Sequence, residues 1–167
     1  MEIFNPQLKG YGHEALRLNV LIRPAKPSDI PGMCGLLSEL FSIESDFSPD
    51  SQKQAEGLSL LLNKRSGLSA VLVAEEGEEI IGMCSVQTLV STAEGGPVGL
   101  VEDLIVKKDH RGNGIGTRLL SAIFRWCKTE NISRLQLLRD ADNESALKFY
   151  ACNGWADTKL VCMRKMF

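Results

Sequence analysis

The sequence has few of the residues that build metal centres or disulfide frameworks. It contains two histidines, His13 and His110, and five widely scattered cysteines with no C-x-x-C pair. Sites made of cysteine and histidine use closely spaced pairs, and disulfide frameworks normally use an even number of cysteines. We therefore expect no metal site and no disulfide framework. Free cysteines also favour a reducing, cytoplasmic location.

Long apolar runs, aromatic residues and net charge are scarce as well. No run approaches the ~18 apolar residues of a membrane span, and the N-terminus lacks the apolar core of a signal peptide. Aromatic residues make up 6% of the chain and the net charge is −2. Such a chain has no general attraction for nucleic acid or for an acidic membrane. We expect neither as a partner, so an anionic ligand must be held by a local site.

The composition is that of one ordinary globular domain. The chain has 167 residues, of which 44% are hydrophobic and 24% are charged. Residues 1–19 show weak periodicity and are punctuated by Pro6, Gly10 and Gly12. We therefore interpret residues 1–19 as an N-terminal extension and residues 20–167 as the domain.

Hydrophobic periodicity predicts a mixed α/β (α+β) fold for residues 20–167. The expected strands are residues 20–23, 70–75, 79–89, 98–106 and 134–138, with one or two more in 155–167. The expected helices run to about residues 41 and 64, from the glycine-rich segment at 111–116 onward, and from about 143 to 153. The prediction is a central, mostly antiparallel sheet of six or seven strands, flanked by about four helices.

A glycine-rich loop joins the apolar strand 98–106 to a helix with Leu119, Leu120 and Ile123 on one face. The loop reads Arg111-Gly112-Asn113-Gly114-Ile115-Gly116. The first turn of a helix has unpaired N–H groups at the positive end of its dipole, and glycines let an anion approach them. Arg111 adds a permanent positive charge. This junction predicts a binding site for a pyrophosphate.

Two well-known phosphate loops do not fit this segment. A Walker loop ends in Gly-Lys-Ser/Thr, whereas Gly116 is followed by Thr117 and Arg118. The dinucleotide fingerprint needs Gly-x-Gly-x-x-Gly, and no register supplies its third glycine. The remaining pattern, Arg-x-x-Gly-x-Gly between a strand and a helix, resembles the acyl-CoA pyrophosphate loop of the GNAT superfamily of N-acetyltransferases.

A second segment supports this resemblance. Asn143-Glu144-Ser145-Ala146-Leu147-Lys148-Phe149-Tyr150, followed by Gly154-Trp155, is similar to the family's Asn-x-x-Ala-x-x-Phe-Tyr…Gly-Phe stretch, with Trp155 in place of phenylalanine. The two motifs occur in the family's order, about thirty residues apart. The resemblance covers about residues 20–167 and implies a GNAT fold whose sheet is splayed between strands 4 and 5.

The resemblance implies acetyl-CoA as co-substrate and no metal. Pantetheine would pair with the backbone of the fourth strand, and the pyrophosphate would lie in the glycine loop. The residues so implied in cofactor binding are Leu104, Ile105, Val106, Arg111, Gly112, Asn113, Gly114, Ile115, Gly116, Thr117 and Asn143. Asp142 or Asn143 is the expected N-cap of the last helix.

Acetyl transfer to an amine needs a proton acceptor for the amine and a proton donor for the thiolate. Presenting an amine of pKa ~10.4 neutral at pH 7 costs roughly 4–5 kcal/mol. The resemblance implies Glu102 as the base, directly or through water, and Tyr150 as the acid, with the N–H of Ile105 or Val106 polarising the carbonyl. The structural alternatives are an ion-paired Glu102 and a Tyr150 that only packs. Strand alternation predicts that Asp103 faces away from Glu102.

The expected function is N-acetyl transfer from acetyl-CoA to a small primary amine by direct attack in a ternary complex, because no cysteine is placed as a nucleophile. Residues 42–50 carry Glu44, Asp46 and Asp50, and residues 100–116 are loosely similar to diamine acetyltransferases; both suggest a cationic amine. A solvated acidic loop is the equal alternative.

Two other functions stay open. One is transfer to a protein N-terminus or lysine, and the other is a CoA-binding sensor without catalysis. The presence of both Glu102 and Tyr150 argues against the sensor. The apolar segment 160–163 also allows a homodimer.

Overall fold

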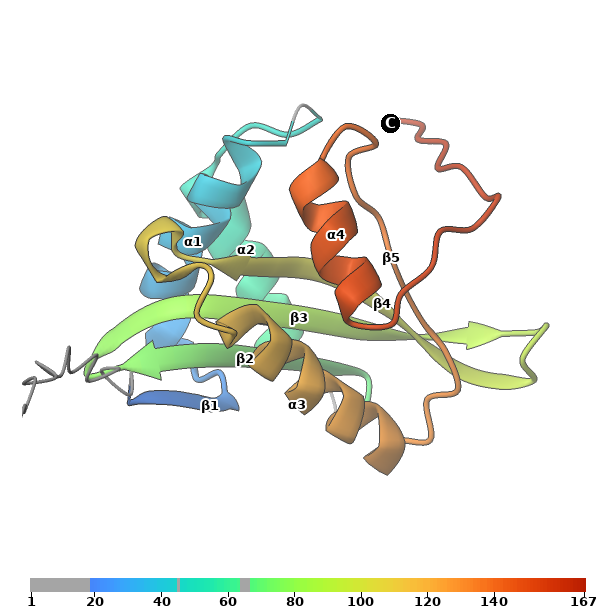
Figure 1. Cartoon of the computed structure of the whole chain (residues 1–167), viewed down its shortest axis with the longest axis horizontal. Coiled ribbons are helices and arrows are strands. Elements are labelled where there is room, and N and C mark those ends of the chain that lie inside the picture. The colour runs from blue at the N-terminus through green and yellow to red at the C-terminus, as the bar shows by residue number, and fades with distance from the viewer. Residues whose placement is uncertain (1–18, 45, 64–66) are drawn as a thin grey trace, which may run out of the picture.

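The computed structural model describes residues 19–44, 46–63 and 67–167. The predicted N-terminal extension, apart from Asn19, lies outside the described residues. The described part contains one sheet of five strands in the order β1-β2-β3-β4-β5 (Figure 1). The strands are β1 Val20–Pro24, β2 Ser69–Glu76, β3 Glu79–Ser91, β4 Gly96–Val106 and β5 Leu135–Leu137. Strands β1 to β4 pair antiparallel, and β5 pairs parallel to β4.

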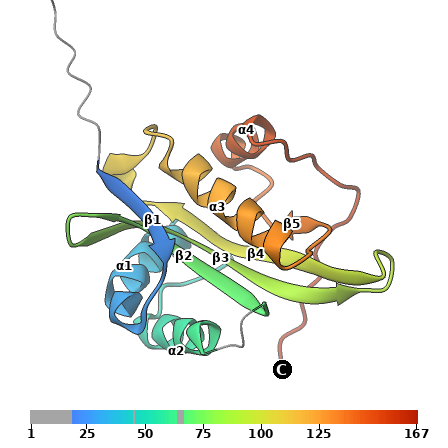
Figure 2. The ribbon, with the colours of Figure 1, turned by 90° about the horizontal axis from the view of Figure 1, so that it is seen from below.

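Four α-helices cover the two faces of this sheet. They are α1 Ile30–Phe41, α2 Ser51–Leu62, α3 Ile115–Thr129 and α4 Glu144–Cys152. Short 3-10 turns precede two of them, η1 Pro27–Asp29 before α1 and η2 Lys108–His110 before α3. Figure 2 shows α1 and α2 on one face of the sheet and α3 and α4 on the other. None of the helices in the described ranges is long and apolar enough to cross a membrane.

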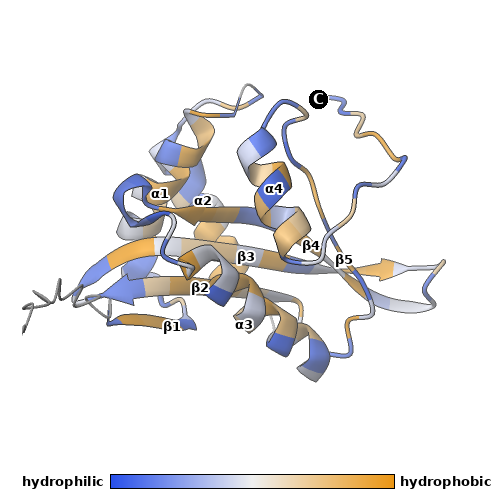
Figure 3. Cartoon of the chain, in the orientation of Figure 1, coloured by the Kyte–Doolittle hydropathy of each residue, from blue (hydrophilic) through white to orange (hydrophobic). Residues whose placement is uncertain are grey.

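Each face of the sheet has its own hydrophobic core. On the α1/α2 face, Met33 and Leu58 pack against strand residues such as Met83. On the α3 face, Leu119 and Ile123 pack against residues such as Cys84. Successive strand residues point to opposite faces, so β3 and β4 supply both cores. Figure 3 shows hydrophobic stretches on both strands and a hydrophilic interruption on β4.

The structure confirms the predicted mixed α/β fold, the four helices and the β2–β3 hairpin. The predicted number of strands is wrong, because the described residues form five strands rather than six or seven. No strand forms in 155–167, where Leu160, Val161 and Met163 are 86%, 86% and 93% exposed. An apolar run indicates strand propensity, but a strand also needs a hydrogen-bonded neighbour, which this segment lacks.

Strands β4 and β5 stay paired over only three residues. The pairs run from Gly99–Leu135 to Val101–Leu137, and β4 then continues alone on this edge to Val106. The strands therefore separate where the predicted splay lies. This opening, the loop after β4 and the start of α4 frame the candidate site.

Candidate active site

The loop that opens α3 has the backbone shape of an anion cradle. Gly112 and Gly114 have φ values of +79° and +74°, which L-residues with a Cβ rarely adopt. No described residue comes within 4 Å of the position of a Cβ on either glycine. Gly114 is the N-cap of α3, and within the described chain no side chain caps this end. The N–H groups of the first turn, at Ile115, Gly116 and Thr117, thus lack intrahelical acceptors.

Gly116 has a different role from the two loop glycines. It lies within α3, and a Cβ there would come 3.1 Å from Cζ of Phe149 on α4. The missing side chain therefore lets α4 approach the first turn of α3. The two sequence motifs meet at this contact.

Arg111 and Asn113 hold the loop in place. Arg111 Nε donates to the Val106 carbonyl (2.8 Å), and its Nη2 donates to Glu39 Oε1 on α1 (2.6 Å). Asn113 Nδ2 donates to the His110 carbonyl (3.2 Å). Arg111 is thus tied back to β4 and α1. Glu39 was missed by the sequence analysis, since it lies on another helix and carries no local signal.

The free edge of β4 presents backbone groups at alternate residues. Lys107 N–H donates to the Ile81 carbonyl on β3 (2.8 Å). In an antiparallel ladder the side to which the N–H and C=O point alternates along the strand. Ile105 therefore points its backbone groups to β3, whereas Leu104 and Val106 point theirs to the open edge. Two of the three residues predicted to pair with pantetheine thus face the opening.

A β-bulge interrupts β4 beside the opening. Val101 pairs with Val86 and Leu104 with Cys84, so Glu102 and Asp103 both lie opposite Ser85. The bulge breaks the strict alternation on which the prediction of opposite faces for Glu102 and Asp103 depended. Glu102 is exposed and makes no hydrogen bond or ion pair with the described residues. The structural alternative of an ion-paired Glu102 therefore has no support here.

Asp103 is a buried carboxyl group, 9% exposed. Its Oδ2 accepts a hydrogen bond from Ser85 Oγ (2.7 Å), and its N–H donates to the same Oγ (3.3 Å). Burial raises the pKa of Asp103, and the charge of Glu102 raises it further, while the Ser85 hydrogen bond lowers it. The sequence analysis did not single out Ser85, and only its polarity within an apolar strand marks it.

Several carboxylates from separate segments converge on this region. Glu44, which follows α1, has its pKa raised first by burial and then by nearby negative charges. Those charges belong to Asp140, Asp103, Asp46 and Glu102. Acidic residues from the α1–α2 loop, β4 and the segment after β5 therefore share one electrostatic neighbourhood.

Tyr150 lies on α4 next to this neighbourhood. Its ring packs edge-on against Phe149 and Trp155, at centroid distances of 5.3 and 5.7 Å. Burial, followed by the charges of Cys84 and Glu44, raises the pKa of Tyr150 to about 12. The phenol is therefore protonated at neutral pH. Tyr150 packs against the same core cluster as Leu104 and Val106 of β4.

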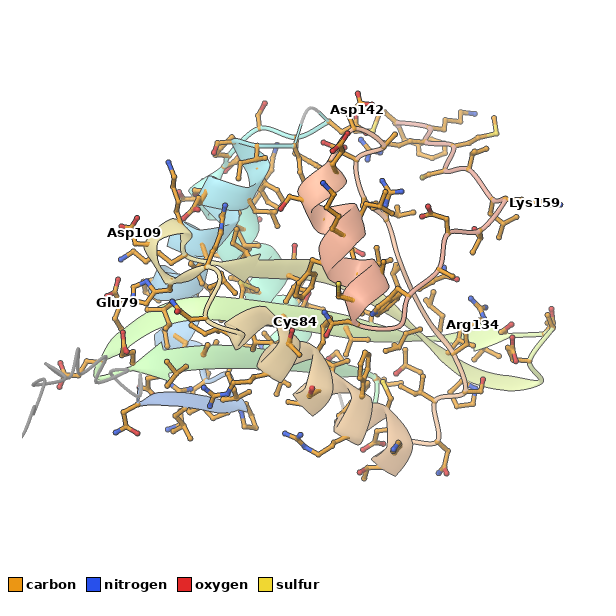
Figure 4. The ribbon with its side chains drawn as sticks, viewed as in Figure 1. Glu79, Cys84, Asp109, Arg134, Asp142 and Lys159 are labelled. Carbon is orange, nitrogen blue, oxygen red and sulfur yellow. The ribbon has the colours of Figure 1, made fainter. Side chains whose placement is uncertain are left out.

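The three buried cysteines are poor nucleophiles in this arrangement. Cys84 lies on the sheet at the α3/α4 side, where Figure 4 labels it, and burial strongly raises its pKa. Burial also raises the pKa of Cys127 to about 11 and that of Cys34. These thiols are protonated at neutral pH and packed in the cores. The described residues contain no group of three or more His, Cys, Asp or Glu that could hold a metal.

Asn143, one of the two predicted candidates, is the N-cap of α4. Its Oδ1 accepts from the Ala146 N–H (2.9 Å), and Gly154, with φ +83°, follows the other end of the helix. The cap fixes the start of α4, so Tyr150 is held two turns further along.

Comparisons with known proteins identify similar sequences and folds. The sequence model of the acetyltransferase (GNAT) family matches residues 36–155. The uncharacterized N-acetyltransferase YhfO of Bacillus subtilis (strain 168) is 27% identical over 136 residues, covering 81% of this chain and 89% of that protein. Streptothricin acetyltransferase A of the same organism is 42% identical over 52 residues, covering 31% of this chain and 30% of that protein.

A solved structure shows the same fold. The aminoglycoside acetyltransferase meta-AAC0020, from an uncultured soil metagenomic sample, superposes with a TM-score of 0.73 at 24% identity. The match covers 89% of this chain and 96% of that chain.

Proposed function

Because the chain belongs to the acetyltransferase (GNAT) family, we propose that it transfers the acetyl group of acetyl-CoA to a primary amine by direct attack. The observation that carries the proposal is one arrangement of three features. An uncapped helix start follows the open edge of β4, the unpaired carboxylate of Glu102 lies on that strand, and the protonated phenol of Tyr150 lies nearby.

The residues of the loop and of β4 fit acetyl-CoA. The first turn of α3 offers N–H donors to a diphosphate, and Gly112 and Gly114 leave the approach open. The outward backbone groups of Leu104 offer hydrogen bonds to an amide-bearing chain laid along β4, whereas the Val106 carbonyl already accepts from Arg111. Asn143, at the start of α4, provides a side-chain amide as a further hydrogen-bonding group for acetyl-CoA. Acetyl-CoA, when bound, supplies the thioester carbonyl that the amine attacks.

The proton of the amine goes to Glu102 in this mechanism. The neutral nitrogen attacks the thioester carbon, a C–N bond forms, and the C–S bond then breaks. The N–H of Val106, which points to the open edge, is the donor that suits the carbonyl oxygen, because Ile105 points its N–H to β3. Glu102 is exposed at the bulge and accepts the proton directly or through water.

Tyr150 returns a proton to the departing thiolate. A phenol of pKa about 12 is a weaker acid than a free thiol of pKa ~8.5, so the transfer is uphill in water. The same burial that disfavours a phenolate also disfavours a thiolate expelled beside it, so its proton affinity rises too. Tyr150 therefore acts as the acid only where the thiolate is formed in the buried site.

A cationic amine is the proposed acceptor. Glu44 has four further carboxylates close enough to raise its pKa, and a cation bound among them would relieve their repulsion. Two similar proteins are named as acetyltransferases of streptothricin and of aminoglycosides. A diamine or polyamine suits such a site better than an amine without a second charge.

The test is a panel of amines incubated with acetyl-CoA, with release of free thiol as the readout. The panel contains a diamine, a monoamine of the same length, and peptides with a free N-terminus or lysine. We expect turnover with the diamine, and a 10²- to 10⁴-fold lower kcat for Glu102→Gln with unchanged acetyl-CoA affinity by calorimetry.

Glu94→Gln is the matched control for this test, since Glu94 is an exposed carboxylate paired with Arg134. Its kcat should equal that of the wild type. Tight acetyl-CoA binding without thiol release from any amine or peptide would favour a sensor. Absence of acetyl-CoA binding would overturn the proposal.

A further inference from the structure

Ser85 is a polar residue at the centre of an apolar strand. It is 0% exposed, and its neighbours Cys84 and Val86 on β3 are also 0% exposed. Its hydroxyl oxygen accepts from the Asp103 N–H, so its single hydrogen is directed to Asp103 Oδ2. An apolar pair of similar size would satisfy the packing without desolvating a carboxylate. Folding alone therefore gives no reason for a serine and an aspartate here.

The pair lies at the irregularity next to the candidate base. Ser85 is the single β3 residue opposite Glu102 and Asp103, and its hydroxyl bonds both the backbone and the side chain of Asp103. The hydroxyl thus clamps the second residue of the bulge. The first residue of the bulge is Glu102, whose side chain is exposed. A bulge re-aims the side chains that it carries, so fixing Asp103 also fixes the direction of Glu102.

The charges around Asp103 are negative. They come from Glu102 on its own strand and from Glu44 after α1, whereas burial keeps the nearby Cys84 thiol protonated. The Ser85 hydroxyl is the group within the described residues that lowers the pKa of Asp103. Without it, the carboxyl group would lose both its orientation and the hydrogen bond that favours its charged form.

We infer that Ser85 is a positioning residue for acetyl transfer: by clamping Asp103 it holds the β4 bulge that directs Glu102 toward the acceptor amine. The inference rests on the proposed function. It assigns Ser85 its main effect on the chemical step and only a small one on the binding of acetyl-CoA, because the pyrophosphate loop lies beyond the far end of β4.

Ser85→Ala tests the inference. We expect kcat to fall about 10- to 100-fold, because a small displacement of a reacting group is enough for such a loss. The KM for acetyl-CoA should stay within about twofold. Asp103→Asn keeps an acceptor for the hydroxyl and should retain more activity than Asp103→Ala.

Thr88→Val is the matched control on the same strand. Its hydroxyl donates to the Gly67 carbonyl (2.8 Å), outside the bulge, so its removal should leave kcat within about twofold. In an Asp103→Ala background, Ser85→Ala should add no further loss. Thermal unfolding of each variant identifies any loss that comes from misfolding.

The outcomes separate the inference from the proposed function. Equal kcat values for Ser85→Ala and Thr88→Val, in an active wild type, would overturn the inference alone. So would a raised KM for acetyl-CoA at unchanged kcat. A wild type that binds acetyl-CoA but acetylates no amine would overturn the proposed function and with it this role of Ser85.

Discussion

Burial has two opposite effects on Tyr150 as a proton donor. Its raised pKa, about 12, keeps the phenol protonated over the whole physiological range, as an acid must be at the start of a cycle. The same burial makes the proton harder to release. The ring also packs between Phe149 and Trp155, so its position does not depend on the hydroxyl.

Tyr150→Phe separates the hydroxyl from the ring. We expect kcat to fall about 10²- to 10⁴-fold with little change in the free energy of unfolding, because the packing is kept and only the acid is lost. The chain has two tyrosines, Tyr11 and Tyr150. Subtracting the ultraviolet titration of the variant from that of the wild type therefore reports Tyr150 alone.

The direction of the pKa shift of Tyr150 determines how the stability of the fold depends on pH. The folded pKa lies above the unfolded value of ~10, so burial of the phenol stabilises the fold fully below pH 10. That contribution is lost as the pH rises from 10 toward 12. Tyr150 should show no ionisation below about pH 11 and cause no basic limb in kcat there. Ionisation near pH 10 would contradict its burial.

The glycine loop shows how far residue patterns predict a site. The open approach at Gly112 and Gly114 could be predicted, because glycines have no Cβ to hold an anion away, whereas their positive φ values became visible only in the structure. The contact of Gly116 with Phe149 could not, because the two residues are distant in sequence and meet only through packing. The same limit applies to Arg111, whose partner Glu39 belongs to α1.

At the scale of elements, α4 was predicted with its cap. The short-range signal is strong, since Asn143 bonds the N–H three residues later. A cap is a local feature, so the sequence contains all of the information needed for it. The contact of Asn143 with acetyl-CoA stays a prediction. Capping alone is enough to account for an asparagine at this position, so the two roles must be tested separately.

Asn143→Asp separates them. Aspartate caps a helix as well as asparagine, and its charge suits the helix dipole, so stability should stay equal or rise. The added negative charge should weaken acetyl-CoA binding about tenfold by calorimetry if the side chain lies near the cofactor. Asn143→Ala should cost about 1 kcal/mol of unfolding free energy as well.

The control for this prediction is the cap of α2. Asp50 Oδ1 accepts from the Gln52 and Lys53 N–H groups (3.1 Å each) in the same manner. Asp50→Asn should leave acetyl-CoA affinity unchanged. If Asn143→Asp binds acetyl-CoA as tightly as the wild type, Asn143 is a cap and nothing more.

The strands were harder to predict than the helices, for a physical reason. The hairpin β2–β3 is local, and its two apolar runs predicted it closely. The bulge at Glu102 and Asp103 depends on the register of β4 against β3. The hydrophobic periodicity of a single strand gives no information about that register. The segment 155–167 has the apolar residues of a strand but no partner in the sheet, so its propensity alone misled the prediction.

At the scale of the whole molecule, the C-terminal segment reaches back to the acidic α1–α2 loop. Figure 1 shows it leaving α4 and ending near the top of the view, on the side of that loop. Arg164 Nη2 lies 3.6 Å from Asp46 Oδ2, and its guanidinium carbon lies 4.9 Å from the Phe47 ring centroid. Arg164 thus places a cation beside one of the carboxylates proposed to attract the acceptor amine.

Arg164→Gln should therefore improve the use of cationic acceptors. An exposed ion pair contributes about 0–1 kcal/mol and an exposed cation–π contact about 0.5–1 kcal/mol. Freeing Asp46 from the ion pair should lower the KM for a diamine by up to about fivefold at low salt, with less effect at high salt. Lys165→Gln removes the same charge from the next residue, which lies over the Phe167 ring instead, and should change the KM little.

Asp46→Asn should raise the KM and cancel the gain from Arg164→Gln, because the two variants act through one carboxylate. If Arg164→Gln and Lys165→Gln lower the KM equally, the net charge of the segment matters and the contact with Asp46 does not.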